Sequence, residues 1–437
     1  MAKVITTELQ HSGASAANIT LDSSKNVTCE NNLTVDGTST LSGNVAVTGN
    51  VTVTGTLPAD KLTGALPAIS GASLTGITSQ DTLSNRNVLI NGAMQINQRD
   101  TTGTLTGLGA SSLATYFIDR WQIYTQNAGT ARFTVSQDTE SPDGFGHSLK
   151  VDCTTADASL DAAAEVLIQQ KLEGYDLQRF EKGFSGAKTY TLSFWAKSDK
   201  TGTYICRLLG RDNTKSCVSK AYTIANTNWN KYTITFPADT DANRKDDSDN
   251  GESFRVVWWL IAGSTTNSGT LQETWANSTD TGAATGQVNF GDATNNFYLT
   301  GTQLEAGSTA TEYEHRSYGD ELARCQRYFW QLINKNNSSI AIASMYSASD
   351  AMWVNHHPVT MRSSPSIRSN INDNTDYLIG RWYNATGGKN GTGNLSVQRV
   401  NKNTILVYSA GWSLPATGAF SLESDNTSCY LGYEAEL

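Results

Sequence analysis

Residues 26–55 repeat with a period of six, and this repeat constrains the fold more than any other stretch of the chain. The five hexads read NVTCEN, NLTVDG, TSTLSG, NVAVTG and NVTVTG. Their second and fourth positions are apolar with the single exception of Ser39, and their sixth position is Asn31 or a glycine. Each hexad therefore predicts a short strand with alternate side chains facing inward, followed by a turn residue that tolerates a positive φ.

The repeat is too short to bury its apolar stripe within one chain. A single-chain β-helix needs about three hexads per coil, so five hexads would give fewer than two coils. A lone strand leaves its backbone groups unpaired. We therefore predict an intertwined homotrimeric β-shaft of identical chains. The sequence itself does not give the number of chains, and we take three because it is the commonest number for such fibres. An ordinary Thr/Gly linker is the alternative, and the regular apolar stripe argues against it.

The composition favours a mainly β protein with many turns. Charged residues make up only 17% of the 437 residues, and the chain contains 37 glycines but only 7 prolines. The net charge is −9 and no basic cluster occurs, so nucleic acid is a poor partner. No apolar run approaches the length of a membrane span and the MAKVITTEL start is too polar for a signal peptide. We therefore expect synthesis in a cytoplasm and no membrane insertion.

Residue types that carry chemistry form no recognisable constellation. The six cysteines include no CxxC pair and no Cys/His cluster at zinc spacing, so we expect free thiols, no metal site and no cofactor. The sequence has no GxSxG motif and no phosphate-binding glycine loop, which predicts no catalytic residues and no enzyme activity. The loop at 239–252 places Lys245 and Asp246 where a calcium loop needs a ligand and a glycine, so we interpret it as a solvated acidic loop.

The region 85–315 predicts an antiparallel β-sandwich or jelly roll, because aromatic and β-branched runs alternate there with turns. Residues 162–172 fit either a helix or a strand, and we take a strand. The strand candidates are 87–96, 117–124, 132–135, 148–151, 162–172, 189–196, 203–209, 231–236, 254–262 and 297–303.

Residues 317–335 carry the helical signal of the chain. Asp320 and Glu321 lie early and Lys335 lies late, as a helix dipole prefers. The apolar positions at helical spacing are Leu322, Cys325, Phe329, Leu332 and Ile333. We therefore predict a connecting helix over 316–336. A C-terminal β domain over 337–437 is expected to follow, with strand candidates at 340–345, 352–356, 366–371, 375–382, 395–400, 404–410 and 430–434.

Several blocks of the sequence together resemble bacteriophage tail-fibre-like proteins, which are common in phages and prophages of marine and other Gram-negative bacteria. The blocks are NVLINGAMQINQR (87–99), DRW (119–121), QQKLEGYDL (169–177), YTLSFWAKS (190–198), FYLTGTQLEAGSTATEYEHRSYGDELARCQRYF (297–329) and VTMRSSPSI (359–367). The resemblance covers roughly residues 85–367, and the opening segment and the hexads also resemble the N-termini of marine phage fibres.

This resemblance implies a homotrimeric fibre on a virion, with the tail as the expected place of attachment. Its outer domains are expected to touch the host surface, and its sandwich is similar to carbohydrate-binding jelly rolls. It implies that residues 1–25 attach to other virion proteins, that 26–84 form shaft and neck, and that the ligand is bacterial surface polysaccharide or lipopolysaccharide. The chain departs from well-known podovirus fibres because only about 25 residues precede the hexads. A head (capsid) decoration fibre, a structural tail component and a polysaccharide depolymerase stay open as alternatives.

Sugar recognition needs a flat aromatic face for stacking, with amides or carboxylates for the hydroxyls. Five aromatic residues lie in or beside Asn-, Gly- and Ser-rich stretches, where recognition loops are expected. The ligand-binding candidates are Trp275, Trp353, Trp382, Tyr383 and Trp412. Trp382 and Tyr383 come first, because a glycine-rich loop follows them. Core packing is the alternative for each.

Overall fold

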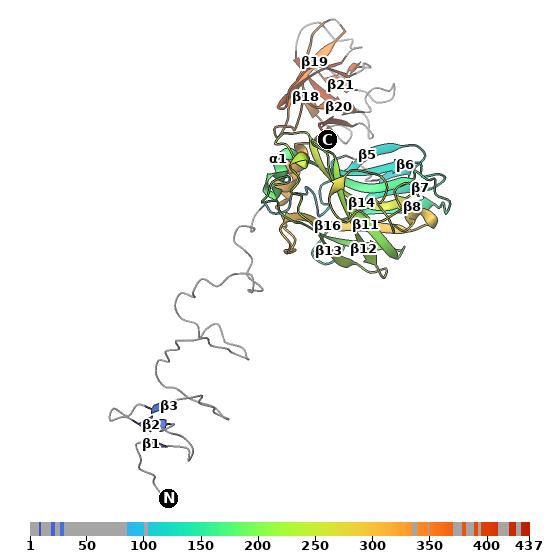
Figure 1. The fold of residues 1–437 in the computed structure, drawn as a ribbon. Helices are drawn as coiled ribbons and strands as arrows, with labels where there is room; N and C mark the ends of the chain where they lie inside the picture. The colour runs from blue at the N-terminus through green and yellow to red at the C-terminus, as the bar shows by residue number, and fades with distance from the viewer. Residues whose placement is uncertain are drawn as a thin grey trace, which may run out of the picture. The chain divides into compact units, whose positions relative to one another are not determined.

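The computed structural model describes residues 8–9, 19–21, 27–29, 85–99, 104–333, 339–347, 349–369, 378–381, 389–391, 395–409, 419–424 and 430–437. The chain divides into two compact units, Met1–Ile77 and Thr78–Leu437. Within the first unit, strands β1 (Glu8–Leu9), β2 (Ile19–Leu21) and β3 (Val27–Cys29) form one antiparallel sheet (Figure 1). Apart from β3, the hexad repeat, the predicted shaft and the neck lie outside the described residues.

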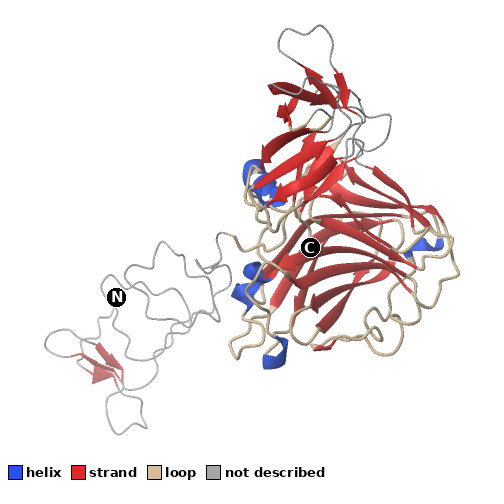
Figure 2. Ribbon diagram, turned by 90° about the horizontal axis from the view of Figure 1, so that it is seen from above, coloured by secondary structure: helices blue, strands red, loops and turns tan. Residues whose placement is uncertain are grey.

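The larger unit contains two antiparallel sheets that share one core. The first sheet has the order β13 (Asn230–Phe236), β10 (Tyr190–Ser198), β16 (Asn296–Ala306), β8 (Ser148–Thr155), β7 (Arg132–Asp138) and β4 (Thr104–Leu108). The second has the order β15 (Ala276–Asn277), β12 (Ser216–Ile224), β11 (Gly202–Gly210), β14 (Glu252–Ala262), β9 (Glu165–Glu173), β6 (Trp121–Gln126) and β5 (Leu113–Ile118). Strands dominate this unit and its helices are short (Figure 2), which confirms the expected mainly β fold.

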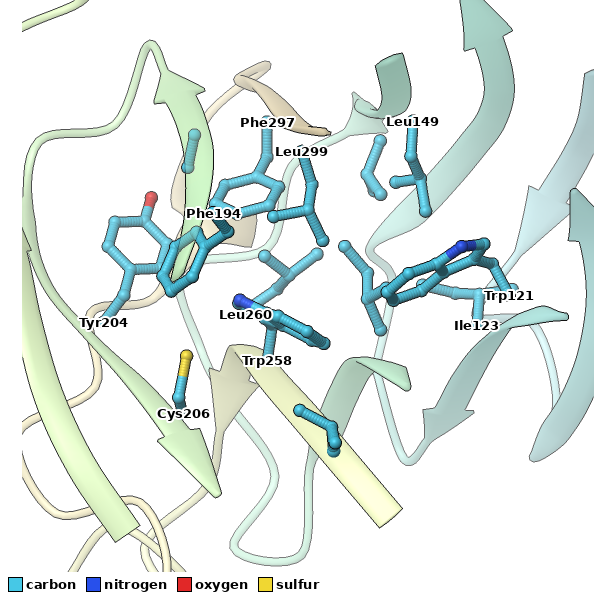
Figure 3. Close-up of a cluster of buried hydrophobic side chains, with 14 of the residues drawn as sticks. Trp121, Ile123, Leu149, Phe194, Tyr204, Cys206, Trp258, Leu260, Phe297 and Leu299 are labelled. Atoms are coloured by element: carbon cyan, nitrogen blue, oxygen red, sulfur yellow. The ribbon is translucent and has the colours of Figure 1, made fainter. Parts of the chain in front are cut away.

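Alternate residues of both sheets meet in the core between them. Trp121 of β6 and Trp258 of β14 are fully buried, with ring centroids 5.6 Å apart. Phe194 of β10 meets Trp258 edge-on at 5.7 Å, and Leu299 of β16 lies in the same cluster (Figure 3). Full burial of an apolar side chain of this size stabilises the fold by about 1.5–3 kcal/mol, so this cluster holds the two sheets together.

Two predicted strands are wrong because polar side chains turn the backbone. Residues 87–96 form turns rather than a strand, with Asn91 at φ 57° and its amide bonded to the backbone of Ile96. The stretch 117–124 is broken between β5 and β6, where Arg120 adopts φ 71°. The strand choice for 162–172 is confirmed by β9, Glu165–Glu173.

The predicted connecting helix is also too long. Helix α2 spans Tyr318–Gln326, and the Ser317 hydroxyl caps it by accepting a hydrogen bond from the Asp320 amide at 3.2 Å. The chain then enters strand β17 (Phe329–Ile333). The apolar residues after Phe329 therefore serve a strand that pairs with β26 (Leu431–Glu434), about a hundred positions later. Pairing across this separation overrides the local helical pattern.

The C-terminal region contributes two further antiparallel sheets, as expected for a β domain. One has the order β17, β26 and β20 (Ser366–Ser369). The other has the order β22 (Lys389–Gly391), β21 (Leu378–Arg381), β25 (Ala419–Ser424), β18 (Ser339–Met345), β19 (Ala351–His356), β24 (Thr404–Ser409) and β23 (Leu395–Val400). Both sheets contribute to one hydrophobic cluster, in which Phe420, Leu431 and Tyr433 are buried.

A buried ionic cluster joins the C-terminal segment to the sandwich. The Glu436 carboxylate pairs with Arg99 at 2.5 Å and with Arg120 through its second oxygen. Both arginine side chains and Glu436 are almost completely buried. Arg120 also lies over the Tyr328 ring, 3.5 Å from its centroid. Because buried charges need close partners, this cluster fixes the C-terminal segment against the hairpin β5–β6.

The thiols of Cys153, Cys206, Cys217 and Cys325 are free and buried, as the sequence predicts for these four residues. Burial raises the pKa of the Cys153 thiol to about 11. These cysteines therefore act as small apolar side chains in the core. Among the described residues, no helix has the length and apolar character needed to span a membrane.

Candidate functional site

The seven-stranded sheet of the sandwich, which contains β6, β9, β11 and β14, carries a groove on its outer face. Along β9, β11 and β14, alternate residues point into the sandwich core and the others point to the opposite face. Trp258 thus joins the core while its neighbour Trp259 belongs to a second apolar cluster. A cavity of about 240 Å³ is lined by Tyr124, Glu165, Leu167, Gln169, Arg207, Leu209, Arg211, Arg255, Val257, Trp259, Ser278 and Asp280.

Strand register arranges the apolar groove residues in a row. Trp259 of β14 lies opposite Leu167 of β9, which in turn lies opposite Tyr124 of β6. Val257 and Ile205 extend the apolar surface beside this row. Trp259 is 2% exposed and Tyr124 is half-buried, so the floor of the groove is apolar and one aromatic ring stands at its accessible side.

The neighbouring row across the sheet is polar except at Val257. Arg207 lies opposite Val257, which lies opposite Gln169, which lies opposite Gln122. The Gln169 amide nitrogen donates a hydrogen bond to Gln122 Oε1. The Arg207 guanidinium donates to Ser278 Oγ at 3.2 Å, which holds the wall of the groove against the sheet. The register therefore places hydrogen-bonding groups directly beside the apolar floor.

Three buried polar atoms of the groove have no hydrogen-bond partner among the described residues. They are Gln169 Oε1, Arg207 Nε and Trp259 Nε1. One is an acceptor and two are donors. Because a buried polar atom without a partner costs about 1–3 kcal/mol, these atoms would gain from a ligand that supplies both donors and acceptors.

Glu165 gives the groove a carboxyl group with a shifted pKa. Partial burial, followed by the negative charge of Asp280, raises the pKa of Glu165 to about 7, and Arg207 opposes this shift. Burial, and then the charge of Glu165, raises the pKa of the Tyr124 hydroxyl as well. Near neutral pH the Glu165 carboxyl is therefore divided between a form that donates and a form that only accepts hydrogen bonds.

A charged rim borders the groove on one side. Glu252 forms ion pairs with Arg255, with Arg211 at 3.3 Å and with Lys171 at 3.5 Å. The Arg255 NH2 group also donates to Glu252 Oε2 at 3.0 Å, which holds the guanidinium against this carboxylate. Among the described residues, no group of three or more His, Cys, Asp or Glu side chains is placed to hold a metal ion.

The aromatic candidates from the sequence lie elsewhere or outside the described residues. Trp353 is 2% exposed in the C-terminal core, and its indole donates to Asn355 at 3.0 Å, so it offers no stacking face and the expectation is corrected. Trp275 is half-buried, donates to the Pro237 carbonyl at 2.7 Å and packs near Tyr190. Trp382, Tyr383 and Trp412 lie outside the described residues.

The acidic loop at 239–252 differs from the solvated loop that we expected. Asp239 is buried, and Asp246 is almost completely covered. The Lys182 ammonium lies 3.6 Å from a carboxylate oxygen of each of these residues. A lysine from outside the loop thus supplies the positive charge, and this contact between distant parts of the chain could not be found from spacing within the loop.

Sequence reasoning missed the groove itself, although one signal was present. The run from Phe254 to Ala262 is apolar at nearly every position, which is typical of a strand that is covered on both faces. The second cover is the segment after β14, where Ala283 and Ala284 pack on Trp259 and its neighbours. The sequence could indicate this second cover, but not the gap that the cover leaves.

No protein-family model matches the chain, and no curated protein matches it. Solved structures similar to it include a CBM4 structure, with 15% identity, a TM-score of 0.26, and coverage of 49% of this chain and 97% of the other. A family 22 carbohydrate-binding module of Clostridium thermocellum has 16% identity, a TM-score of 0.25, and coverage of 49% and 100%.

A third similar structure is the enzymatically active domain of tailspike protein 4 of bacteriophage CBA120. It has 13% identity and a TM-score of 0.24, and the match covers 51% of this chain and 21% of that one. Because the TM-scores of all three structures lie below 0.5, we infer nothing about ligand or activity from them. The function proposed below rests on the groove and on the sequence.

Proposed function

We propose that this chain is a non-catalytic, glycan-binding subunit of a phage fibre, and that the groove holds a segment of host surface polysaccharide or lipopolysaccharide. One observation carries the glycan-binding part: three residues that line a groove with an apolar floor each hold a buried polar atom without a hydrogen-bond partner among the described residues. An oligosaccharide matches this arrangement, because its hydroxyls both donate and accept hydrogen bonds while its C–H faces pack against apolar and aromatic side chains.

The charges of the groove favour a glycan over a lipid or a nucleic acid. Arginines and carboxylates alternate around it, and Glu252 already pairs with the rim cations Arg255, Arg211 and Lys171. A nucleic acid would need an uncompensated basic surface, and the chain carries a net charge of −9. A hydroxyl-rich, extended ligand is the class that uses both the polar row and the apolar row.

The sequence supports the fibre role. The tail-fibre-like blocks cover roughly residues 85–367, and the hexads predict that several copies of the chain associate. On this proposal residues 1–25 bind other virion proteins, 26–84 form the shaft, 85–315 the glycan-binding sandwich and 337–437 the tip. Trp382, Tyr383 and Trp412 stay predicted contacts at that tip. Electron microscopy of labelled virions would separate a tail fibre from a head decoration fibre.

We propose further that the fibre is a homotrimer and that the tip takes part in its assembly. One face of the C-terminal sheet is apolar and open to solvent, with Ile342 77% exposed, Tyr346 68% and Val354 47%. Strand register places Leu406 beside Val354, and Tyr408 lies near Tyr346. Exposed sheet faces of this kind mark interaction surfaces, and further copies of the chain are the occupants that the hexad repeat predicts.

The glycan-binding proposal is tested with purified protein on an array of bacterial polysaccharides and lipopolysaccharides. We expect binding to at least one surface glycan and adsorption of the protein to cells that display it. If the protein neither binds a glycan on the array nor adsorbs to cells, the receptor role is overturned and a structural tail component remains. A depolymerase would instead release new reducing ends when incubated with that glycan, and we expect none.

A further inference from the structure

A second pocket lies where the segment after β9 meets the acidic loop. Its volume is about 540 Å³, more than twice that of the groove. Helix α1 (Gly174–Leu177) and the following turn supply Leu177 and Glu181 to its wall, and Phe184 and Asp246 also line it. The groove and this pocket share no lining residue.

Asp246 is the unusual group in this pocket. Its side chain is 6% exposed, yet neither carboxylate oxygen has a hydrogen-bond partner among the described residues. The Lys182 ammonium lies 3.6 Å from Oδ1, and it donates instead to the Arg244 carbonyl. Arg244 in turn pairs with Asp239 at 3.3 Å. The negative charge of Asp246 is therefore compensated, whereas its oxygens still lack donors.

An exposed aromatic ring, Phe184, lines the same pocket as this carboxylate. Phe184 is 51% exposed, and the Lys245 ammonium lies 4.1 Å from its ring centroid. The backbone that carries the ring is tightly held: Gly183 has φ +81°, its amide donates to the Asp239 carbonyl at 2.7 Å, and a Cβ there would meet Lys245 at 2.4 Å. Only glycine fits at this position, so the chain keeps Phe184 presented to solvent.

We propose that this pocket is a second carbohydrate-binding site, which takes a single neutral sugar ring. Hydroxyls of the ring donate to the two oxygens of Asp246, and its C–H face lies against Phe184. A neutral ligand fits better than a cationic one, because Lys182 already balances the charge of Asp246. Burial, and then the charges of Asp212 and Asp239, raises the pKa of Asp246 to about 7, and Lys182 opposes this shift.

The two sites flank the same end of β11, which gives the second site a function. Leu209 and Arg211 line the groove, whereas a Cβ on Gly210 between them would lie 3.0 Å from the Lys182 ammonium. One chain can therefore hold a surface glycan at two points. Two weak contacts on one surface bind far more tightly than either alone, without any new contact.

Fluorine NMR of the full chain, labelled with 4-fluorophenylalanine, tests the site directly. The Phe184 signal is assigned by its loss in Phe184→Leu. The probes are the methyl glycosides of glucose, galactose, mannose, N-acetylglucosamine and glucosamine. We expect at least one neutral glycoside to shift the Phe184 signal in a saturable manner, and we expect Asp246→Asn to weaken that binding at least about tenfold. The signals of the other phenylalanines report whether each variant is folded.

Two control variants make the outcome decisive. Tyr175 is an exposed aromatic outside the pocket, and Tyr175→Ala should leave the titration unchanged. Tyr124→Ala alters only the groove, so it should also leave the Phe184 shift unchanged. The result for the pocket is therefore independent of whether the groove binds a glycan. The proposal is overturned if no neutral glycoside moves the signal, if only the glucosamine ammonium form does so, or if folded Asp246→Asn responds like the parent.

Discussion

Replacing Glu436 by glutamine should loosen the C-terminal segment from the sandwich. In the parent chain the Glu436 carboxylate pairs with Arg99 at 2.5 Å and with Arg120, and all three side chains are at most 4% exposed. Among the described residues, Arg99 keeps Glu434 at 2.7 Å and Asp119 at 3.8 Å as partners, whereas Arg120 keeps a hydrogen bond to the Lys171 carbonyl and a contact with the Tyr328 ring. The substitution therefore leaves one buried guanidinium without an ion-pair partner among the described residues.

Breaking a buried ion pair from one side costs about 3–5 kcal/mol. Because glutamine keeps the shape and can still accept one hydrogen bond, we expect a loss of about 3 kcal/mol, at the lower end of that range. The assay is hydrogen exchange of the amides of β17 and β26, together with urea unfolding. Amide exchange at Phe329–Ile333 and Leu431–Glu434 should accelerate by about a hundredfold, because a loss of about 3 kcal/mol changes the opening equilibrium by about that factor.

Glu312→Gln is the matched control. Glu312 pairs with Lys231 at 3.6 Å, but its side chain is 96% exposed, so its removal should cost well under about 1 kcal/mol. The reasoning is refuted if Glu436→Gln and Glu312→Gln have the same effect, or if exchange in β17 and β26 is unchanged in Glu436→Gln. Either result would mean that burial of this ion pair does not hold the C-terminal segment.

Three further predictions test the core, the groove and the oligomer. Leu208→Ala empties a fully buried position and should cost about 2–5 kcal/mol in urea unfolding, against well under that for Leu113→Ala at a part-exposed strand start. Because the pKa of Glu165 is raised in the folded state, the folded protein loses stability as the pH rises from about 4.5 to 7. Glu165→Gln should remove about 1–2 kcal/mol of that loss, after allowance for solvent screening. The measurement is the free energy of unfolding of both proteins at pH 5 and at pH 8. Ile342→Asp should lower the mass found by light scattering, and a parent-like mass would contradict the tip interface.

Elements with strong local signals could be predicted from the sequence. The runs 189–196 and 254–262 are rich in aromatic and β-branched residues; the first overlaps β10 from Tyr190 onward, and the second lies within β14. The mainly β character follows from the same signals together with the low charge content. Where turn residues bounded an apolar run, the strand was found to within a few residues.

Elements that depend on distant partners could not be predicted. The segment 87–96 looks like a strand, but Asn87 bonds to the backbone of Thr302 and Leu304, more than two hundred residues away. The end of α2 is set by the pairing of β17 with β26. Local patterns contain no information about which distant backbone will accept or donate, so propensity fails where these contacts decide.

The candidate site was hidden for a different reason. Its residues alternate with core residues on the same strands, so Trp258 and Trp259 have the same local context but opposite roles. Trp353 lies beside a loop-like sequence and was therefore a ligand-binding candidate. Its strand β19 is paired on both sides, by β18 and β24, and its side chain is buried in the core. The groove arises from the register of β6, β9, β11 and β14 and from the segment that covers them only in part.

The most direct test of the central claim is calorimetric titration of the full chain with an oligosaccharide of the glycan identified on the array. Tyr124→Ala removes the accessible aromatic ring of the groove, and Tyr175→Ala removes an exposed aromatic ring elsewhere. Truncation of an aromatic anchor in a binding site to alanine costs about 2 kcal/mol, so the groove variant should bind about tenfold to a hundredfold more weakly. Parent-like affinity in Tyr124→Ala, or an equal loss in Tyr175→Ala, would contradict the groove as the glycan site.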